Sequence, residues 1–494
     1  MNMNINRDKA SFQSYWNIVL GADSYKASHH GMYPEGMTYM ESYAESRGGR
    51  FPYSVFFGLQ YFIKSYLLGQ QVTQEKLDVA TEFYAKHFGN SEIFDKQMWQ
   101  LIIDKHNGHI PIRIKSVLEG SLVPIKNCLF KIESTDEKCA KIVNWVETLL
   151  MKVWSPTTVA TNSFAGLEII KLHLEKSGTL GSEQFLLHDF GYRGVASEEQ
   201  AGLCGAAHLL SFSGTDNIAG IRLLEHFYGS TEMTGFSVPA SEHSVMCSGL
   251  KENEIETVKS ILKKFPKGPI SIVADTWNVY KFCENIALDA ECKSLIVNRD
   301  GVLVIRPDSG DPKTVLEDCL NILSTGFGYT ANSKGYKVLN SVKLIQGDGI
   351  NIDTMDDILN YLEHKGWSSD NLIFGSGGGL LQSFNRDSMK FAIKACYIET
   401  DGIGYGIKKD PITSLGKDSK KSKSGKVELV WTDTGYQTQC DENSVSGQQE
   451  LVTVYENGQL MIDQTYQQIK ARLAYDTARL ETIYTQLEQK SNND

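Results

Sequence analysis

The sequence lacks the cysteine patterns that mark disulfide-rich or zinc-binding proteins. Its nine cysteines lie at irregular spacing between Cys128 and Cys440, and none forms a Cys-x-x-Cys pair. An odd number of cysteines without paired spacing indicates neither a disulfide framework nor a zinc site. We therefore expect the protein to work in a reducing compartment.

Long apolar runs are absent as well. No stretch approaches the roughly 18 apolar residues that a membrane span needs, and Met1 to Gln13 contains no apolar signal core. We expect a cytoplasmic protein that does not bind membranes. The net charge of −11 argues against general nucleic-acid binding, although it is compatible with a local basic pocket.

The chain has 494 residues, of which 41% are hydrophobic and 22% are charged. This composition is typical of globular proteins, and the length suffices to bury a large core. The first 150 residues mix both kinds of secondary structure. Their patterns predict strands within 37–46 and 111–134, and helices within 53–68, 73–88 and 138–154.

From about residue 180 to 380, short apolar runs alternate with helical patterns. The runs are Phe185–Asp189, Ile270–Asp275, Val302–Asp308, Val342–Asp348 and Asn371–Gly379. This alternation predicts parallel strands joined by right-handed crossovers. A closed α/β barrel and an open parallel sheet satisfy the pattern equally well.

Helix starts follow several of these runs. Ser197 with Gln200 predicts a capping box. Asp311, which precedes a proline, predicts an N-cap with proline in the first turn. Either Asp353 or Thr354 is expected to cap the next helix.

The last zone begins near residue 387 and contains no internal repeat. It predicts a strand over 388–399 and a loop rich in Lys, Ser and Gly over 408–426. Apolar residues then recur at helical spacing from Ile469 to Leu487. This stripe favours a docked terminal helix over a short coiled coil.

Four aspartates follow the apolar runs, namely Asp189, Asp275, Asp308 and Asp348. Ligands of parallel α/β folds bind at the carboxyl ends of the strands. Carboxylates that converge there suit a sugar diol or a hydrated magnesium ion. Capping of the following helices is the alternative, and it is weaker for Asp308 because Asp311 already supplies a cap.

Two arginines and a glycine run share the same predicted edge. Arg193 precedes a predicted helix start and Arg306 precedes Asp308, which suits phosphate binding, although lone arginines more often form surface ion pairs. The run from Gly375 to Gly379 either cradles phosphate with its N–H groups or forms a plain turn. It matches neither the phosphate-binding loop of nucleotidases nor the dinucleotide fingerprint.

Residue type alone does not decide the roles of His243 and Phe190. His243 beside Glu242 suits a base or a phosphoryl acceptor, but a hydrogen-bonded loop histidine is the commoner case. Phe190 fits either stacking on a flat ring or core packing. A sugar-phosphate isomerase or aldolase would require a strand-end lysine or a Glu/His pair, and no lysine ends any of the five runs. A non-catalytic binding protein on the same fold is a further alternative.

With these residues collected, the sequence resembles the nicotinamide phosphoribosyltransferase family from about Asn17 to about Lys426. The matching segments are ADSYK (22–26), FFGLQY (56–61), HDFGYRG (188–194), GTD (214–216), SVPASEHS (237–244), IRPDSG (305–310), IQGDG (345–349) and FGSGGGLLQ (374–382). Their length and common order exclude chance agreement.

The resemblance implies an enzyme that joins nicotinamide to phosphoribosyl pyrophosphate, with Mg²⁺ as cofactor and ATP as a further substrate. It also implies a homodimer with shared active sites. The implied fold is an α/β-barrel-like catalytic domain at 151–386 beside a discontinuous mixed α+β domain at 1–150 and 387–494. Nicotinate phosphoribosyltransferase is the alternative within the same chemistry.

For the pyridine ring, the resemblance implies that Phe190 stacks on one face and Tyr25 of the partner subunit covers the other. Asp216 is implied to accept a hydrogen bond from the carboxamide. Arg193 and Asp23 complete this end of the site.

For the sugar and phosphates, the resemblance implies that Asp275 and Asp308 bind the ribose hydroxyls and the magnesium shell. Arg306 is implied to contact the 5′-phosphate, and ATP to phosphorylate His243 with help from Glu242. The other implied ribose and phosphate contacts are Arg47, Ser237, Gly347, Asp348, Gly377, Gly378, Arg386 and Lys394.

Overall fold

A computed structural model describes residues 15–413, 416–417, 421–440 and 446–491. The chain divides into two compact units. Unit 1 comprises Met1–Thr158 with Asn385–Asp494, and unit 2 comprises Val159–Phe384. Within the described ranges, no helix combines the length and the apolar character that a membrane crossing requires.

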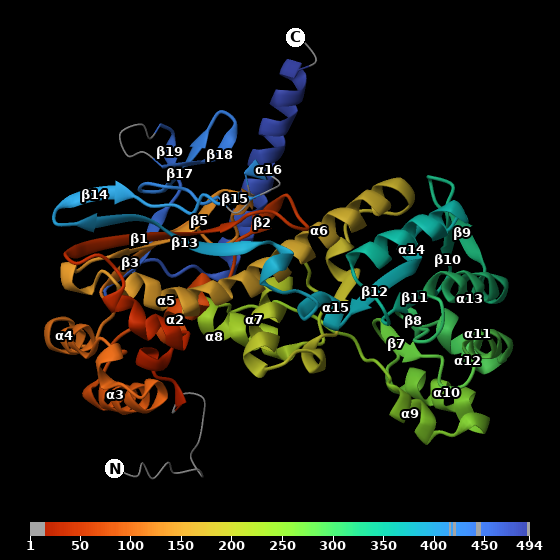
Figure 1. The fold of residues 1–494 in the computed structure, drawn as a ribbon. Coiled ribbons are helices and arrows are strands. Elements are labelled where there is room, and N and C mark those ends of the chain that lie inside the picture. The colour runs from red at the N-terminus through yellow and green to blue at the C-terminus, as the bar shows by residue number, and fades with distance from the viewer. Residues whose placement is uncertain (1–14, 414–415, 418–420, 441–445, 492–494) are drawn as a thin grey trace. The chain divides into compact units, whose positions relative to one another are not determined.

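Unit 1 is built on a seven-stranded antiparallel sheet in the order β14-β13-β1-β5-β3-β20-β21 (Figure 1). Its strands are β1 (Met37–Ser46), β3 (Ile112–Ser116), β5 (Cys128–Ser134), β13 (Phe391–Thr400), β14 (Ile403–Gly406), β20 (Val452–Glu456) and β21 (Gln459–Leu460). Because β1 pairs with β5 on one side and β13 on the other, both ends of the chain contribute to one sheet.

Helices and smaller sheets pack around this sheet. Helix α5 (Ile142–Leu150) packs against β1 and β5 through a buried apolar face. The other elements are α2 (Leu59–Tyr66), α3 (Gln74–Phe88), α4 (Lys96–His106), α16 (Tyr466–Ser491), β2 (Tyr53–Val55), β4 (Leu122–Pro124), β15 (Ile412–Thr413), β16 (Gly416–Lys417), β17 (Glu428–Thr432), β18 (Gly435–Gln439) and β19 (Gln448–Gln449). Ile469, Leu473, Leu480 and Ile483 of α16 are buried, which confirms the docked terminal helix. Leu487 lies outside the residues whose side chains are described.

Unit 2 contains a five-stranded parallel sheet in the order β6-β12-β11-β8-β7. The strands are β6 (Leu187–Asp189), β7 (Ile270–Val273), β8 (Leu303–Arg306), β11 (Val342–Gln346) and β12 (Leu372–Ser376). The surrounding elements are α6 (Trp154–Ser177), α7 (Glu198–His208), α8 (Ile218–Tyr228), α9 (His243–Ser248), α10 (Glu254–Lys264), α11 (Val279–Leu288), α12 (Ala290–Val297), α13 (Pro312–Phe327), α14 (Ile352–His364), α15 (Gly378–Leu381) and the hairpin of β9 (Tyr329–Ala331) and β10 (Lys337–Leu339). Every one of the five predicted runs contains one of these parallel strands.

Two short segments close this sheet into a ring. Beside β6, the N–H of Asp216 donates to the carbonyl of Asp189 at 3.0 Å, and the N–H of Thr215 donates to the carbonyl of Phe236 at 2.9 Å. At the other edge, the N–H of Ser241 donates to the carbonyl of Ser271 in β7 at 3.0 Å. Single parallel bridges at the same places complete the circuit. The structure is therefore a closed α/β barrel, which confirms the predicted fold class and decides against the open sheet.

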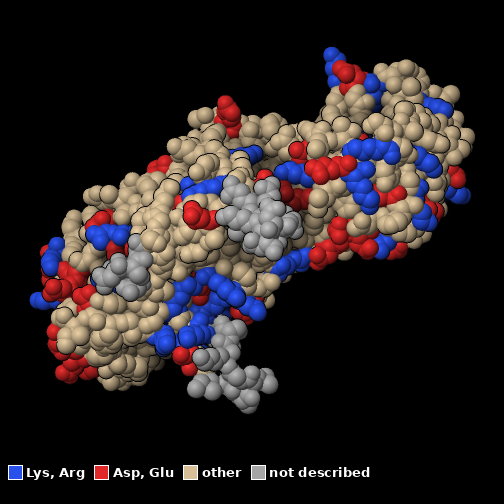
Figure 2. All heavy atoms as spheres, turned by 90° about the horizontal axis from the view of Figure 1, so that it is seen from above, with Lys and Arg blue, Asp and Glu red and all other residues tan. Residues whose placement is uncertain are grey.

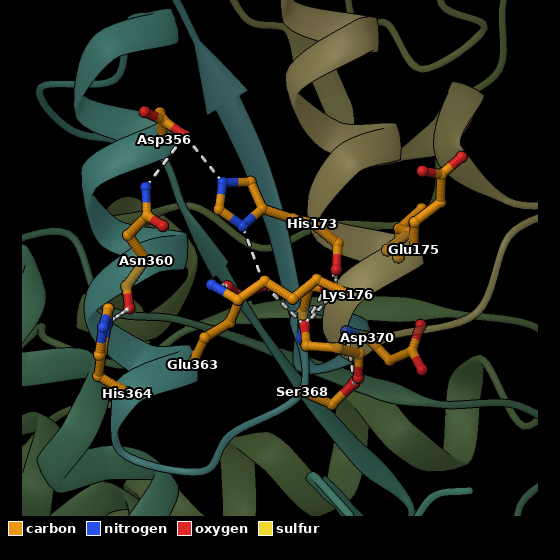
Figure 3. A network of polar contacts seen from close by, with 12 residues as sticks. His173, Glu175, Lys176, Asp356, Asn360, Glu363, His364, Ser368 and Asp370 are labelled. Carbon is orange, nitrogen blue, oxygen red and sulfur yellow. Dashed lines mark hydrogen bonds and ion pairs between the residues drawn. The ribbon is translucent and has the colours of Figure 1, made fainter. Parts of the chain in front are cut away.

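A buried polar network joins the end of α6 to α14. His173 lies between two carboxylates, with Nδ1 2.9 Å from Oε1 of Glu363 and Nε2 2.8 Å from Oδ1 of Asp356 (Figure 3). The ammonium of Lys176 lies 2.6 Å from the other oxygen of Glu363. Burial alone would raise the pKa of Glu363, but hydrogen bonds from Lys176, His173 and Ser177 hold that pKa below its usual value. The network thus fixes α6 against the outer layer of the barrel.

The predicted helix over 53–68 is wrong at its start. Residues Tyr53–Val55 form strand β2, and α2 begins only at Leu59, after Gly58 adopts a left-handed φ of 102°. The apolar run allowed either structure, because short apolar runs lack a distinguishing period. Pairing of β2 with β4 decided the outcome.

Two predicted caps also differ from the structure. Asn351, and neither Asp353 nor Thr354, caps α14, and Thr354 instead forms the reciprocal bond of the capping box. Ser197 caps α7 as predicted, but the side chain of Gln200 accepts from the N–H of Ala196 and not from Ser197. The cap at Asp311 with proline in the first turn of α13 is confirmed.

Candidate active site

A cavity of about 420 Å³ occupies the interior of the barrel. Strands β8 and β11 line it with alternate residues, because successive side chains of a strand point to opposite faces. Val304 and Arg306 come from β8, and Lys343 and Ile345 come from β11. Arg306 stands at the carboxyl end of its strand, where the cavity also meets Phe190, Asp216 and Ser237. We call this end of the cavity the mouth, and these four residues the mouth residues.

The ring of Phe190 packs directly on the backbone of β12. A β-carbon at position 375 would lie 2.0 Å from Cε2 of Phe190, and one at position 347 would lie 3.7 Å from the same atom. The N–H of Phe190 also donates to the carbonyl of Ser376 at 2.9 Å. The glycine at position 375 is therefore needed for the close approach of an aromatic ring, a role that the sequence pattern did not reveal.

Asp216 and Ser237 meet at the mouth from the two segments that close the ring. The hydroxyl of Ser237 donates to Oδ1 of Asp216, and both residues are exposed. One oxygen of the carboxylate is thereby held in place, and the other is left to accept from a ligand. Sequence reasoning placed Ser237 among the ribose and phosphate contacts, whereas here it contacts the residue predicted to bind the carboxamide.

Asp189 lies beneath the mouth, where it binds other protein groups and is not available to a ligand. It is fully buried, and its two oxygens accept from the N–H of Gly191 at 2.7 Å and from the amide of Asn217 at 2.9 Å. Burial raises the pKa of Asp189 to about 6. Asp189 therefore fixes the turn that presents Phe190, and Asn217 is a supporting residue that the sequence did not single out.

The ends of β8 and β11 place Asp308 beside the mouth. Oδ2 of Asp308 lies 3.9 Å from Nη2 of Arg306, and Oδ1 lies 3.5 Å from the position that a β-carbon on Gly347 would take. Gly347 in turn neighbours Phe190. Phe190, Arg306, Asp308 and Gly347 thus gather in one place at the carboxyl ends of β6, β8 and β11. This is the edge of the sheet at which the strand-end position of Arg306 and Asp308 predicted a ligand site.

His243 is joined to the end of β7. Its Nε2 lies 2.9 Å from Oδ1 of Asp275, whose other oxygen accepts from the hydroxyl of Ser309. The side chain of Asp275 is 7% exposed and that of His243 is 46% exposed. The aspartate therefore orients an imidazole that solvent and ligands can reach. Ser309 was missed by sequence reasoning, although it directly follows Asp308 within a quoted motif.

Asp275 and Asp308 follow adjacent strands and offer the oxygen ligands that Mg²⁺ prefers. Both oxygens of Asp275 already have protein partners, so Asp308 has the greater capacity for an ion or its water shell. This arrangement suits magnesium, which usually keeps several waters and takes one or two protein carboxylates together with substrate phosphates.

The remaining predicted residues of unit 2 lie at the same end of the barrel without lining the cavity. Arg193 is exposed in the turn η8 (Tyr192–Gly194), and a β-carbon on Gly194 would lie 3.5 Å from the N atom of Gly378. The carbonyl of Phe190 lies 3.6 Å from the corresponding position on Gly377. Asp348 and Glu242 are exposed.

The five predicted residues in unit 1 form two groups. Asp23 and Tyr25 lie at the start of η3 (Ser24–Gly31), and Tyr25 is 60% exposed. Arg47, Arg386 and Lys394 form the second group. Burial lowers the pKa of Lys394, and the positive charges of Arg47, Arg386 and Lys409 lower it further. The three cations therefore repel the charge of Lys394, while Glu147 attracts it. The excess of positive charge suits an anionic ligand.

The face of the molecule drawn in Figure 2 does not carry charge of a single sign. Figure 2 shows acidic and basic side chains interspersed over the face seen there. The net charge of −11 is therefore compatible with a local cationic group such as the one around Lys394.

Comparison with known proteins adds sequence relatives and a similar fold. Residues 185–459 match the Nicotinate phosphoribosyltransferase (NAPRTase) family, and residues 17–114 match the Nicotinamide phosphoribosyltransferase, N-terminal domain. The chain is 40% identical over 471 residues to a nicotinamide phosphoribosyltransferase of Xanthomonas campestris pv. campestris, which covers 94% of this chain and 99% of that protein.

A second relative has the same name as the first, and a solved structure has a similar fold. The nicotinamide phosphoribosyltransferase of Acinetobacter baylyi is 33% identical over 500 residues, covering 93% of this chain and 97% of that protein. The crystal structure of a nicotinate-nucleotide pyrophosphorylase from Pyrococcus furiosus aligns with a TM-score of 0.59 at 14% identity, covering 96% of this chain and 98% of that one. At this identity the structural likeness supports the fold alone.

Proposed function

Because the chain belongs to the nicotinate phosphoribosyltransferase family, we propose that it transfers the phosphoribosyl group of phosphoribosyl pyrophosphate to nicotinamide, releasing pyrophosphate and forming nicotinamide mononucleotide. One observation carries this proposal: a flat aromatic ring, an oriented carboxylate and an arginine surround the mouth of a single cavity in the barrel. A pyridine carboxamide and a sugar phosphate require these groups side by side.

Asp216 supports nicotinamide over nicotinate. Ser237 occupies one carboxylate oxygen, so the other is available to accept from the carboxamide NH₂. The carboxylate of nicotinate would instead face a like charge, which disfavours its binding. Nicotinate remains the alternative substrate, because the family includes enzymes of both kinds.

The transfer requires positioning and charge stabilisation more than a protein nucleophile. Positive charge develops at C1 of the ribose while pyrophosphate departs with negative charge. Phe190 would hold the pyridine ring so that its nitrogen faces C1, and Arg306 would bind the 5′-phosphate, with Asp308 on the ribose hydroxyls. Bound magnesium, held by Asp275 and Asp308, would neutralise part of the pyrophosphate charge.

We further propose a homodimer with shared active sites. Tyr25 and Asp23 of one subunit would cover the pyridine bound by the other, and Arg47, Arg386 and Lys394 would bind phosphate groups. The exposure of Tyr25 and the positive charges gathered around Lys394 support this proposal, because an exposed ring suits the cover of a pyridine and a group of cations suits phosphate.

ATP is proposed to phosphorylate His243. The γ-phosphoryl group would pass to a ring nitrogen, and ADP would leave. The exposure of the imidazole and its contact with Asp275 support the assignment, because an accessible imidazole held in one orientation is a competent phosphoryl acceptor. Glu242 would assist from the position before α9. All nine cysteines are free, which supports work in a reducing cytoplasm.

A single assay series tests these proposals. Purified protein is incubated with phosphoribosyl pyrophosphate, Mg²⁺ and either nicotinamide or nicotinate, with and without ATP, and the mononucleotide is quantified. The expected result is turnover of nicotinamide that ATP increases, with a His243→Ala variant losing the increment. Turnover of nicotinate alone would show that the protein is a nicotinate phosphoribosyltransferase. Turnover of neither substrate would contradict the proposal that it is a phosphoribosyltransferase.

A further inference from the structure

Unit 1 contains a cluster of three metal-ligating side chains outside the groups discussed above. His106 is the last residue of α4, Asp136 precedes the turn η5 (Glu137–Cys139), and Cys139 ends that turn. The ligand atoms of all three lie within 4.8 Å of one another. Helix α4 (Figure 1) packs against η5, so two elements far apart in the sequence bring these atoms together.

One carboxylate oxygen of Asp136 contacts both an imidazole and an ammonium group. Its Oδ2 atom lies 2.9 Å from Nε2 of His106 and 2.5 Å from the ammonium of Lys105, while its Oδ1 accepts from the N–H of Lys138. The side chain of Asp136 is 3% exposed. A buried carboxylate oxygen of this kind binds a compact positive charge strongly, because few waters compete for it.

Cys139 points into the same cluster without a hydrogen-bond partner among the described residues. It is fully buried. A sulfur, a nitrogen and an oxygen thus lie within 4.8 Å of one another, and the ammonium of Lys105 contacts the oxygen.

We propose that His106, Asp136 and Cys139 bind one zinc ion. This mixed donor set suits Zn²⁺, which takes cysteine sulfur, histidine nitrogen and carboxylate oxygen in tetrahedral sites. Tetrahedral ligands with bond lengths of about 2.0–2.3 Å lie about 3.3–3.7 Å apart. Nε2 of His106 and Oδ2 of Asp136, which are 2.9 Å apart, must therefore separate slightly, and the sulfur, which lies within 4.8 Å of both, must settle at a similar distance. Water completes the fourth position. The spacing of the cysteines did not predict this site, because its ligands come from distant parts of the chain.

Binding exchanges one cation for another. The zinc ion forms a bond to the sulfur of Cys139, and the thiol proton leaves to solvent. The imidazole of His106 binds through Nε2 as the Nδ1–H tautomer. The ammonium of Lys105, whose side chain is 61% exposed, moves out to water. The bound ion would link the end of α4 to η5 and so hold the helical layer of unit 1 to the loop after β5.

Zinc titration of the full chain tests the site. Protein stripped with a chelator is titrated with zinc against a chromogenic competitor, and cobalt(II) is added separately to detect the absorption of a metal–thiolate bond. We expect one zinc per chain and a thiolate band. Cys139→Ala and His106→Gln should each weaken binding by at least about 100-fold, since even indirect contacts to a metal contribute 10–100-fold.

Matched controls separate this site from incidental binding. Cys292→Ala removes another buried cysteine and His109→Gln removes a neighbouring histidine, and both should bind zinc normally. Lys105→Ala removes the competing cation and should tighten binding. Transferase turnover of each variant checks its folding. Absence of stoichiometric zinc, or zinc affinity that survives both Cys139→Ala and His106→Gln, overturns the proposal.

Discussion

The contact between Gly375 and Phe190 makes the most decisive prediction. An alanine at position 375 would place its β-carbon 2.0 Å from Cε2 and 2.2 Å from Cδ2 of Phe190. Carbon atoms in contact lie about 3.5–4.0 Å apart, so the ring must retreat by about 1.5 Å or more. Such overpacking costs about 1–3 kcal/mol of folding stability, and the displaced ring would no longer hold the pyridine correctly.

A misplacement of 1 Å in an active site can cost about 100-fold in rate. We therefore expect Gly375→Ala to lower kcat/KM for nicotinamide by at least about 100-fold, or about 2.7 kcal/mol of transition-state stabilisation. Steady-state kinetics measure this loss, and chemical denaturation verifies that the variant remains folded.

Gly31→Ala is the control. A β-carbon at position 31 would meet no atom within 4 Å, and Gly31 is not among the residues assigned to the site, so its effect should be small. In a Phe190→Ala background, Gly375→Ala should cause little further loss, because the ring that it displaces is gone. Near-normal kcat/KM in Gly375→Ala, or an equal loss in Gly31→Ala, would refute the role of this contact.

Three other perturbations address charge. Arg306→Ala should lower kcat by about 10²–10³-fold, as is typical when a charged transition-state contact is lost, and near-normal turnover would remove Arg306 from the site. Asp216→Asn should narrow the ratio of kcat/KM for nicotinamide over nicotinate, and an unchanged ratio would assign ring choice to another residue. Glu363→Gln should lower the free energy of unfolding at neutral pH by about 1–3 kcal/mol, because Glu363 accepts buried hydrogen bonds. Since the folded protein holds the pKa of Glu363 below 4.5, its contribution is complete above that pH and disappears as pH falls further. Denaturation at several pH values should therefore show a shallower acid dependence for Glu363→Gln, and parallel curves would contradict this role.

Local patterns predicted the elements of the barrel well. The apolar runs that contain β6, β7, β8, β11 and β12 are short and end in polar or glycine residues, so their period and boundaries were visible. The cap at Asp311 followed from local hydrogen bonding. The motifs around Phe190, Asp216 and Arg306 indicated the family, which the sequence relatives bear out.

Local sequence patterns did not predict contacts between residues that are distant in the chain. Asp189 and Asp216 are both acidic and both belong to segments that match the family, yet one is buried under the turn and the other is exposed at the mouth. The zinc ligands proposed above come from the end of a helix and from a turn about 30 residues later. Sequence spacing reports neither burial nor convergence when the connecting chain is this long.

The sequence by itself determined the strands, the polar residues that follow them and the family. These properties depend on neighbouring residues, because side-chain alternation and capping act over a few positions. Only the tertiary structure decided that the sheet closes through residues 213–216 and 236–241 and that Phe190 rests on Gly375. Closure and close packing depend on hydrogen bonds and distances between chain segments that no local pattern encodes.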